Sequence, residues 1–319
     1  MTAPNPPKRP IVRPYGTAAI DAAAAHIRAG DPVAIPTETV YGLAADATRG
    51  ESVAAIYAAK GRPAFNPLIV HVLDLATAER IAVFDPVARL LATTFWPGPL
   101  TLVLPTRGDG GIAALVTAGL PTIALRVPAH RAMRALLAAT GLPLAAPSAN
   151  ASGGISPTRA AHVARSLGGR IPFVVDDGPT ALGLESTIVA FGNGVLRLLR
   201  PGPITAAMLR DATGLAVTDT ATGTIEAPGQ LASHYAPRLP IRLNATTAGP
   251  DEWHIGFGVV AGDRSLSLRG DPIEAAAALF DALHVADASG RTAIAVAPIP
   301  ADGLGAAIND RLARAAAPR

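Results

Sequence analysis

The stretch Pro36-Thr37-Glu38-Thr39-Val40-Tyr41-Gly42-Leu43 is decisive for the fold of this 319-residue chain. The short apolar run before it has the composition of a buried strand, which opens here into hydroxyls, a carboxylate and a phenol. From this point strand-like and helix-like segments alternate, a pattern that predicts an α/β domain. A strand end enriched in threonine for its β propensity explains the stretch equally well when it is taken alone.

The segments that follow have the lengths of ordinary strands and helices. Strands are predicted at 32–37, 43–47, 68–72, 100–104, 122–127, 144–146, 173–175, 186–191 and 196–199, and helices at 51–60, 75–83, 86–95, 130–139, 158–167 and 205–211. Before them, the Ala-rich stretch from Thr17 to Gly30 has the capping pattern of a first helix. The last strands are separated by turns too short for a crossover helix, so an antiparallel component is expected. We therefore predict a twisted mixed parallel/antiparallel sheet with flanking helices.

A second unit is predicted at the C-terminal end. The stretch from Ala212 to Pro240 is first small and polar and then rich in Pro and Gly, which is typical of a linker. Beyond it, strand-like segments (255–258, 292–297) alternate with helix-like ones (272–283, 304–315). This pattern predicts a small second α/β domain.

Composition excludes several classes of protein. The chain has no Cys, so disulfides, thiolate zinc sites and cysteine nucleophiles are ruled out. No apolar run is long enough for a membrane span, and the N-terminus has no secretory signal pattern, so we expect a cytoplasmic protein. Residues 1–200 carry 18 Lys/Arg and 12 Asp/Glu, whereas residues 201–319 carry 9 and 12. The first part should therefore attract anions.

The common phosphate-binding and catalytic fingerprints are missing. There is no Gly-x-x-x-x-Gly-Lys-Ser/Thr, no Gly-x-Gly-x-x-Gly between strand and helix, no Gly-x-Ser-x-Gly and no His-Glu-x-x-His. The seven His residues have no metal-ligand spacing. A nucleotide site in this chain must be built in another way.

Basic residues mark candidate anion contacts. Lys60 and Arg62 flank a glycine at a predicted helix end and can point at one anion, although a solvated lysine is a common alternative. His71 and Arg126 fall inside apolar strands. The histidine suits a satisfied core position as well as a ligand contact, and the arginine needs either a protein carboxylate or a ligand anion as its partner.

A loop rich in Ser and Gly runs from Pro147 to Thr158 between a strand and a helix. Backbone N–H groups in such loops form anion-binding concavities, especially beside a helix N-terminus. A solvated loop explains this composition equally well on its own.

The joint pattern resembles the threonylcarbamoyl-AMP synthases that are built on a YrdC-like domain. The matching segments, within residues 12–210, are "PTETVYGLAADA", "KGRPAFNPLIVHV", "FWPGPLTLVL", "TIALRVP", "APSANASGGISPT", "ESTIV" and "LRPG". The segments "SHYAP" (233–237) and "GLGAAINDRLARA" (303–315) resemble the longer members, which append a small Rossmann-like domain. The resemblance implies a flexible tail (1–11), a YrdC-like catalytic domain (12–212), a linker or lid (213–240) and a C-terminal α/β domain (241–319).

The resemblance also implies a reaction. Threonine, bicarbonate or CO2, and ATP would give L-threonylcarbamoyl-AMP and pyrophosphate, and this chemistry needs charge neutralisation more than a covalent nucleophile. The adenylate would pass to a tRNA threonylcarbamoyl transferase complex that modifies tRNA next to the anticodon. Contact with tRNA is compatible with this activity and is not required for it, and no membrane is involved.

Site residues follow from the resemblance position by position. The expected threonine contacts are Thr39, His71, Arg126, Ala146 and Ser186. The expected ATP contacts are Lys60, Arg62, Asn66, Thr122, Ser148, Asn150, Ser156, Arg200 and Tyr235, with Lys60 and Arg62 as the catalytic pair on the phosphates. Mg²⁺ is expected to accompany ATP. Glu38 or Glu185 could organise it, and its ligands are left open.

Two features depart from the family pattern, and two other functions compete. Ala64 and Phe65 occupy a position where family members often carry charge, and the second domain is compact.

An RNA-binding module without catalysis suits the basic first part, although aromatic residues make up only 4% of the chain. A carbamoyltransferase that handles carbamoyl-adenylate is the other alternative. It is disfavoured because no acylphosphatase-like or zinc-finger segment is found.

Overall fold

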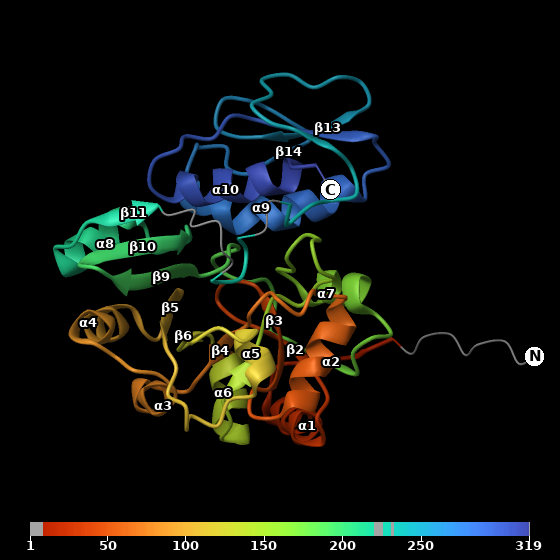
Figure 1. Ribbon diagram of the computed structural model, residues 1–319. Coiled ribbons are helices and arrows are strands. Elements are labelled where there is room, and N and C mark those ends of the chain that lie inside the picture. Colours follow the sequence, from red (N-terminus) through yellow and green to blue (C-terminus); the bar gives the residue numbers. More distant parts are fainter. Residues whose placement is uncertain (1–8, 220–225, 231–232, 319) are drawn as a thin grey trace, which may run out of the picture.

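The computed structural model describes most of the chain. The described residues are 9–219, 226–230 and 233–318. Residues 1–8 of the predicted tail, residues 220–225 and 231–232 of the predicted linker, and residue 319 lie outside them. Figure 1 shows a larger domain and, packed against it, a smaller one formed by the C-terminal part of the chain.

The larger domain is built on one mixed sheet, which has 11 strands in the described part of the chain. In spatial order these are β1 (Ile11–Pro14), β8 (Phe173–Asp176), β2 (Val33–Pro36), β3 (Tyr41–Asp46), β7 (Leu144–Ala145), β4 (Ile69–His71), β6 (Thr122–Arg126), β5 (Leu100–Pro105), β9 (Thr187–Gly192), β10 (Val195–Arg200) and β11 (Val217–Asp219). Parallel and antiparallel pairs occur together: β4 is parallel to β6, and β7 is antiparallel to both β3 and β4. The predicted mixed sheet is confirmed.

Helices cover both faces of this sheet (Figure 1). They are α1 (Thr17–Ala29), α2 (Gly50–Lys60), α3 (Leu75–Ile81), α4 (Pro86–Phe95), α5 (Ala114–Thr117), α6 (Arg131–Thr140), α7 (Ala160–Leu167) and α8 (Ala206–Thr213). Successive strand residues serve opposite faces, because side chains alternate along a strand. Phe173 and Val175 of β8 join the core under α1 and α6, whereas Val174 joins the core under the other helices.

Three of these elements are absent from the sequence prediction. The edge strand β1 is exposed along its length and carries a proline, and prolines next to it suggested a tail. The single-turn helix α5 has only four residues. Strand β11 lies inside the stretch predicted as a linker and pairs with β10. Short edge elements of this kind have too little periodicity to be detected in a sequence.

The smaller domain has a parallel sheet, as a Rossmann-like unit requires. Its strands, in spatial order, are β12 (Ile241–Arg242), β15 (Ala293–Val296), β13 (Glu252–Gly256) and β14 (Arg264–Ser265). Helices α9 (Pro272–Asp287) and α10 (Leu304–Ala316) lie between this sheet and the larger domain (Figure 1). The predicted second α/β domain is confirmed.

The two domains share a continuous apolar interface. Val40, Ile155 and Leu184 of the larger domain belong to the same buried cluster as Phe280 of α9. Gly183 shows how closely the domains approach, because a β-carbon built there would lie 2.4 Å from the Ala276 carbonyl oxygen. Its positive φ of 69° also favours glycine.

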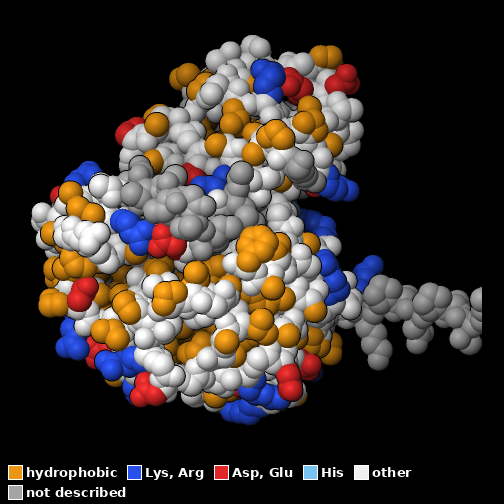
Figure 2. All heavy atoms as spheres, viewed as in Figure 1, with side chains coloured by type: hydrophobic (Ala, Val, Ile, Leu, Met, Phe, Trp, Pro, Cys, Tyr) orange, Lys and Arg blue, Asp and Glu red, His pale blue; other side chains and the backbone are white. Residues whose placement is uncertain are grey.

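The surface is mixed in charge. On the face drawn in Figure 2, Lys and Arg side chains are distributed around the edge of the larger domain, several of them beside Asp or Glu. None of the helices in the described part of the chain combines the length and hydrophobicity needed to span a bilayer.

Candidate active site

A pocket opens where central strands of the larger sheet end. Strands β4 and β6 run parallel, with His71 in register with Arg126 at the final position of each strand. Ala146 follows directly after β7, which lies next to β4. Thr39 lies in the turn between β2 and β3. The ends of neighbouring strands and the turn between β2 and β3 therefore bring these four residues together.

The pocket encloses about 540 Å³ of empty space including its mouth. Its wall combines strand ends, the Lys60–Arg62 loop and the segment that leads to the smaller domain. The lining residues are Thr37, Thr39, Val40, Gly42, Arg62, Ile69, His71, Arg126, Ala146, Pro147, Ser148, Glu185, Ser186, Arg200, Pro228, Gly229, His234 and Tyr235.

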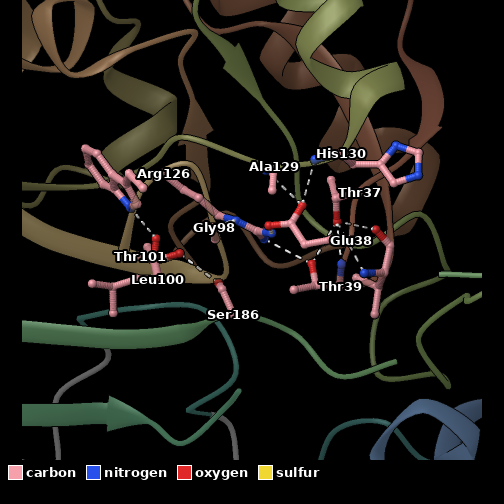
Figure 3. Close-up of polar contacts among 12 residues, drawn as sticks. Thr37, Glu38, Thr39, Gly98, Leu100, Thr101, Arg126, Ala129, His130 and Ser186 are labelled. Carbon is pink, nitrogen blue, oxygen red and sulfur yellow. Dashed lines mark hydrogen bonds and ion pairs between the residues drawn. The ribbon is translucent and has the colours of Figure 1, made fainter. Parts of the chain in front are cut away.

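Arg126 is held by three hydrogen bonds to two segments of the chain (Figure 3). Its Nη2 donates to Glu38 Oε1 at 2.5 Å, its Nη1 to Thr39 Oγ1 at 3.0 Å and its Nε to the Gly98 carbonyl at 3.1 Å. The side chain is 3% exposed. The partner that the buried arginine required is thus the carboxylate of Glu38. A guanidinium has five N–H donors, so these contacts leave capacity for a second anion.

Glu38 is fixed as a carboxylate. Its Oε2 accepts from the backbone N–H groups of Ala129 and His130, at 3.2 and 3.3 Å. Burial disfavours the charged form, but the charge and hydrogen bond of Arg126, with the backbone donors, hold the pKa of Glu38 below its usual value. The Glu38 carboxyl group is therefore ionised at neutral pH, and its hydrogen bond with Arg126 keeps the guanidinium in one orientation.

A second buried arginine, Arg200, also lines the pocket. Arg200 ends β10, and its Nη2 donates to Ser186 Oγ at 3.1 Å while its Nε donates to the Ser186 carbonyl at 3.0 Å. The Ser186 hydroxyl also contacts Thr101 Oγ1 at 2.7 Å (Figure 3). This network fixes the Ser186 hydroxyl between Thr101 and the buried Arg200.

Lys60 ends α2 and supports the Ser148–Asn150 loop. Its Nζ donates to the carbonyls of Ser148 and Asn150, at 2.5 and 2.6 Å, and the residue is 3% exposed. Burial, followed by the charges of Arg62 and Arg170, lowers the pKa of Lys60 well below its usual range. An anion bound beside this loop would favour the ammonium form.

Arg62 follows Lys60 on the same loop and faces the pocket. Its Nε donates to the Asn66 carbonyl at 3.2 Å and its Nη2 to the Pro67 carbonyl at 2.9 Å. Burial lowers the pKa of Arg62 to about 10, so the guanidinium remains charged at neutral pH. It adds a third arginine to the pocket wall.

Several buried polar atoms at the site have no hydrogen-bond partner among the described residues. These are both side-chain polar atoms of Asn66, Asn150 Oδ1, His71 Nδ1, His234 Nδ1 and the Tyr235 hydroxyl. Burial is the main cause that lowers the pKa of His71 and of His234 to about 3, so both rings are neutral at physiological pH. Unpaired buried polar atoms are costly, and their concentration here indicates a polar ligand.

The segment before the smaller domain closes one side of the pocket. Tyr235 is 1% exposed and has a positive φ of 63°, which is uncommon for a residue other than glycine. Its hydroxyl would lie 2.8 Å from a β-carbon at Gly229, and Arg200 Cδ would lie 2.9 Å from the same atom. Gly229, with a φ of 87°, thus allows this segment to approach Arg200 closely.

The structure brings most of the predicted site residues together. Nine of them line the pocket: Thr39, Arg62, His71, Arg126, Ala146, Ser148, Ser186, Arg200 and Tyr235. Lys60, Asn66 and Asn150 are buried next to it, and Ser156 reaches its wall by donating to Glu185. Thr122 lies apart, at the start of β6, whose last residue is Arg126. The ligand contact predicted for Thr122 stays a prediction.

Sequence reasoning missed three groups at the site. Thr101 contacts Ser186, His234 lines the pocket beside Tyr235, and Arg311 of α10 donates to Glu185 Oε2 at 2.8 Å. His234 lies in the quoted "SHYAP" segment, and Arg311 lies in "GLGAAINDRLARA". These two segments were therefore the available signal: Tyr235 was predicted from the first, whereas nothing in them singled out His234 or Arg311.

The carboxylates at the site do not fit a metal centre made by the protein alone. Glu38 and Glu185 are each engaged by an arginine, and no group of three His, Cys, Asp or Glu suited to a metal ion is found in residues 9–219, 226–230 and 233–318. Mg²⁺ is commonly held by one or two carboxylates together with substrate phosphates and water. The site is therefore better suited to a metal that arrives with a nucleotide.

Comparison with known proteins identifies the family. The profile described as "Telomere recombination", for the Sua5, YciO and YrdC proteins, matches residues 25–202, and the profile described as "Threonylcarbamoyl-AMP synthase, C-terminal domain" matches residues 204–317. The chain is 40% identical over 323 residues to threonylcarbamoyl-AMP synthase of Bacillus subtilis, covering 93% of this chain and 92% of that protein. The chain belongs to the threonylcarbamoyl-AMP synthase family. Membership makes it an enzyme of the nucleotidyltransferase class.

Other members of the synthase family agree with this assignment. Threonylcarbamoyl-AMP synthase of Pyrococcus abyssi is 39% identical over 317 residues, covering 92% of each chain. The crystal structure of P. abyssi Sua5 complexed with L-threonine matches this structure with a TM-score of 0.87 at 36% identity, over 96% of this chain and 97% of that one. The two-domain architecture is thus common to these synthases.

Proposed function

We propose that this chain forms L-threonylcarbamoyl-AMP and pyrophosphate from L-threonine, bicarbonate or CO2, and ATP. The observation that carries the proposal is the pocket at the ends of β4 and β6, where three arginines converge with unpaired buried polar atoms. Such a wall suits a ligand that combines anionic groups with hydrogen-bonding ones. The family supplies the identity of the reactants, and a P. abyssi member binds L-threonine.

The threonine subsite lies at the Glu38–Arg126 end of the pocket. Arg126 keeps donor capacity for the substrate carboxylate, because Glu38, Thr39 and Gly98 use only part of it. Thr39, Ser186 and the carbonyl of Ala146 offer hydrogen bonds to the amine and hydroxyl. His71 is neutral, so its ring does not repel the ammonium group of the incoming substrate.

The ATP subsite lies along the Lys60–Arg62 loop and the Ser148–Ser156 loop. Lys60 and Arg62 are placed to contact the β- and γ-phosphates, and Arg200 to contact the phosphate nearest threonine. The further predicted contacts are Asn66, Thr122, Ser148, Asn150, Ser156 and Tyr235. Mg²⁺ accompanies ATP as part of the substrate, and we assign it no protein ligand.

The reaction needs two bond-forming steps. The threonine amine, in its neutral form, attacks the carbon of CO2 and gives a carbamate with loss of one amine proton; from bicarbonate the same bond forms as a C–O bond breaks and water leaves. A carbamate oxygen then forms a bond to the α-phosphorus while the bond from that phosphorus to the bridging oxygen breaks, and pyrophosphate leaves with that oxygen. Lys60 and Arg62 neutralise the charge that develops on the leaving group, which is the main catalytic contribution expected in phosphoryl-type transfers.

We also propose how the chain is divided and used. Residues 12–212 form the catalytic unit, residues 213–240 a linker that serves as a lid, and residues 241–319 the C-terminal domain. The product passes in the cytoplasm to a transferase complex that modifies tRNA next to the anticodon. The proposal is compatible with tRNA contact and does not depend on it.

Pyrophosphate release tests this proposal. The purified chain is incubated with ATP, Mg²⁺ and bicarbonate, with and without L-threonine, next to Lys60→Ala and Arg126→Ala variants. We expect release that requires threonine and is lost in both variants. Threonine-independent release driven by carbamoyl phosphate would favour a carbamoyltransferase. No release by the folded chain, together with tight tRNA binding, would favour an RNA-binding module.

A further inference from the structure

Arg311 is the point at which the smaller domain reaches the candidate site. It lies on α10 and its side chain is 0% exposed. Its Nε donates to Glu185 Oε2 at 2.8 Å, its Nη1 to Asp310 Oδ2 at 2.6 Å and its Nη2 to the Pro201 carbonyl at 2.9 Å. Burial of a guanidinium is costly unless such partners are present. Two of the three acceptors belong to the larger domain, so the arginine is satisfied only when the domains are docked.

Both acceptors on the larger domain adjoin pocket residues. Glu185 directly precedes Ser186, and Pro201 directly follows Arg200. Arg200 and Ser186 are themselves joined at the pocket wall, because Arg200 Nη2 donates to Ser186 Oγ. Arg311 thus holds the residue next to each partner of the Ser186–Arg200 contact, through the side chain of Glu185 and the backbone carbonyl of Pro201.

Glu185 connects Arg311 to the proposed ATP subsite through two hydrogen bonds. Its Oε2 accepts from Arg311, and its Oε1 accepts from the hydroxyl of Ser156. Ser156 is 0% exposed and ends the loop that Lys60 supports at its other end. A chain of charge-assisted hydrogen bonds therefore runs from α10 to a predicted ATP contact.

The ion pair between Arg311 and Glu185 also affects the electrostatics of the pocket. Glu185 lines the pocket in which ATP is proposed to bind, and a bare carboxylate there would repel phosphates. Burial raises the pKa of Glu185, but the charges of Arg311 and Arg200 and the hydrogen bond from Ser156 outweigh it, so the carboxyl group stays ionised. Arg311 is the counterion in direct contact with it.

Helix α10 also contacts the linker segment that contains His234 and Tyr235. The Arg311 guanidinium carbon lies 5.1 Å from the centre of the Tyr235 ring, a distance suited to a cation–π contact. One turn further along α10, the Arg314 carbonyl accepts from the His234 N–H at 3.2 Å. The pocket wall formed by His234 and Tyr235 therefore packs directly against α10.

We propose that Arg311 is a positioning residue for ATP: by neutralising and orienting Glu185, it makes docking of the C-terminal domain a condition for a complete nucleotide subsite. The inference rests on the proposed function, because ATP is the nucleotide assigned to this pocket. Arg311 acts through Glu185, Ser156 and Tyr235, and touches no reacting atom itself.

A purely architectural role makes a different prediction. If Arg311 only joined the domains, its loss would lower stability and affect both substrates to the same extent. A positioning role predicts a larger effect on ATP than on threonine, because the threonine subsite is anchored by Glu38 and Arg126. Of the proposed threonine contacts, only Ser186 adjoins a residue that Arg311 holds. It also predicts that a neutral side chain at position 185 relieves the loss of the arginine, because no unpaired carboxylate then faces the phosphates.

The test compares KM for ATP and for threonine, measured by pyrophosphate release, in the full-length chain. We expect Arg311→Met to raise KM for ATP by about tenfold or more and KM for threonine by less than about threefold. Arg311→Met combined with Glu185→Gln should recover much of the loss. The matched control is Arg242→Met, which removes an exposed pair with Glu252 in the same domain and should leave both constants unchanged.

Specific outcomes overturn the inference. Equal rises in both KM values, or an unchanged KM for ATP in a destabilised variant, would reduce Arg311 to an architectural residue. If circular dichroism shows that Arg311→Met does not fold, Arg311→Lys, which keeps the charge and loses the fork, should still raise KM for ATP more than KM for threonine, and equal rises would again overturn the inference. If the unmodified chain releases no pyrophosphate with threonine, the proposed function fails, and equilibrium binding of ATP to the same variants then decides the role of Arg311 separately.

Discussion

Replacement of Arg126 by methionine tests the most constrained contact of the site. Methionine fills a similar length of pocket but leaves the Glu38 carboxylate buried without its cation. The pair is 3% and 12% exposed at its two side chains, with 2.5 Å between Nη2 and Oε1. Removing one partner of a buried ion pair costs about 3–5 kcal/mol, so Arg126→Met should lower the free energy of unfolding by about that amount.

Urea unfolding at pH 7, followed by circular dichroism, measures the loss. The double variant Glu38→Gln/Arg126→Met should be more stable than Arg126→Met, because it leaves no buried charge. The matched control is Arg131→Met, whose pair with Asp177 is exposed on the arginine side (70%) and should contribute about 1 kcal/mol or less. A cost for Arg126→Met as small as that of the control would refute the reasoning that the pair is buried and structurally required.

Three further outcomes follow from the same geometry. Lys60→Met should weaken ATP binding by about tenfold or more and leave threonine binding nearly unchanged in calorimetry, since Lys60 supports only the loop at the nucleotide end. Gly229→Ala should raise KM for ATP in pyrophosphate-release assays, because its methyl group would meet Tyr235 and Arg200 and strain a φ of 87°. The folded-state pKa of Glu38 lies below its unfolded value, so its stabilising contribution is complete above the unfolded pKa near 4.3 and is lost as pH falls through the folded pKa. Acid unfolding curves of wild type and Glu38→Gln should therefore converge at low pH.

Much of the fold is predictable from the sequence because its elements are local and regular. The helix predicted at 86–95 is α4, with Asp85 as an N-cap that accepts from the Ala88 N–H and proline at its first position. The strand predicted at 122–127 is β6 to within one residue. In both cases composition and period agree over the whole element, and for α4 the capping residue agrees as well.

The candidate site is predictable only in part, because its partners are distant in sequence. An arginine in an apolar strand required a partner, yet nothing in the sequence chose between a ligand and Glu38, which lies 88 positions away. Arg311 lies 126 positions from Glu185, on a domain whose placement depends on tertiary packing. The left-handed backbone of Tyr235 was likewise invisible, since residues other than glycine rarely adopt it.

The central claim is that this pocket joins threonine, a one-carbon unit and AMP. The most direct measurement is mass spectrometry of the product formed from L-threonine, ATP, Mg²⁺ and ¹³C-labelled bicarbonate, after rapid quenching. The account predicts a species with the mass of threonylcarbamoyl-AMP that carries the heavy carbon and is absent without threonine. Formation of AMP and pyrophosphate without any labelled adenylate, or an adenylate that forms without threonine, would contradict it.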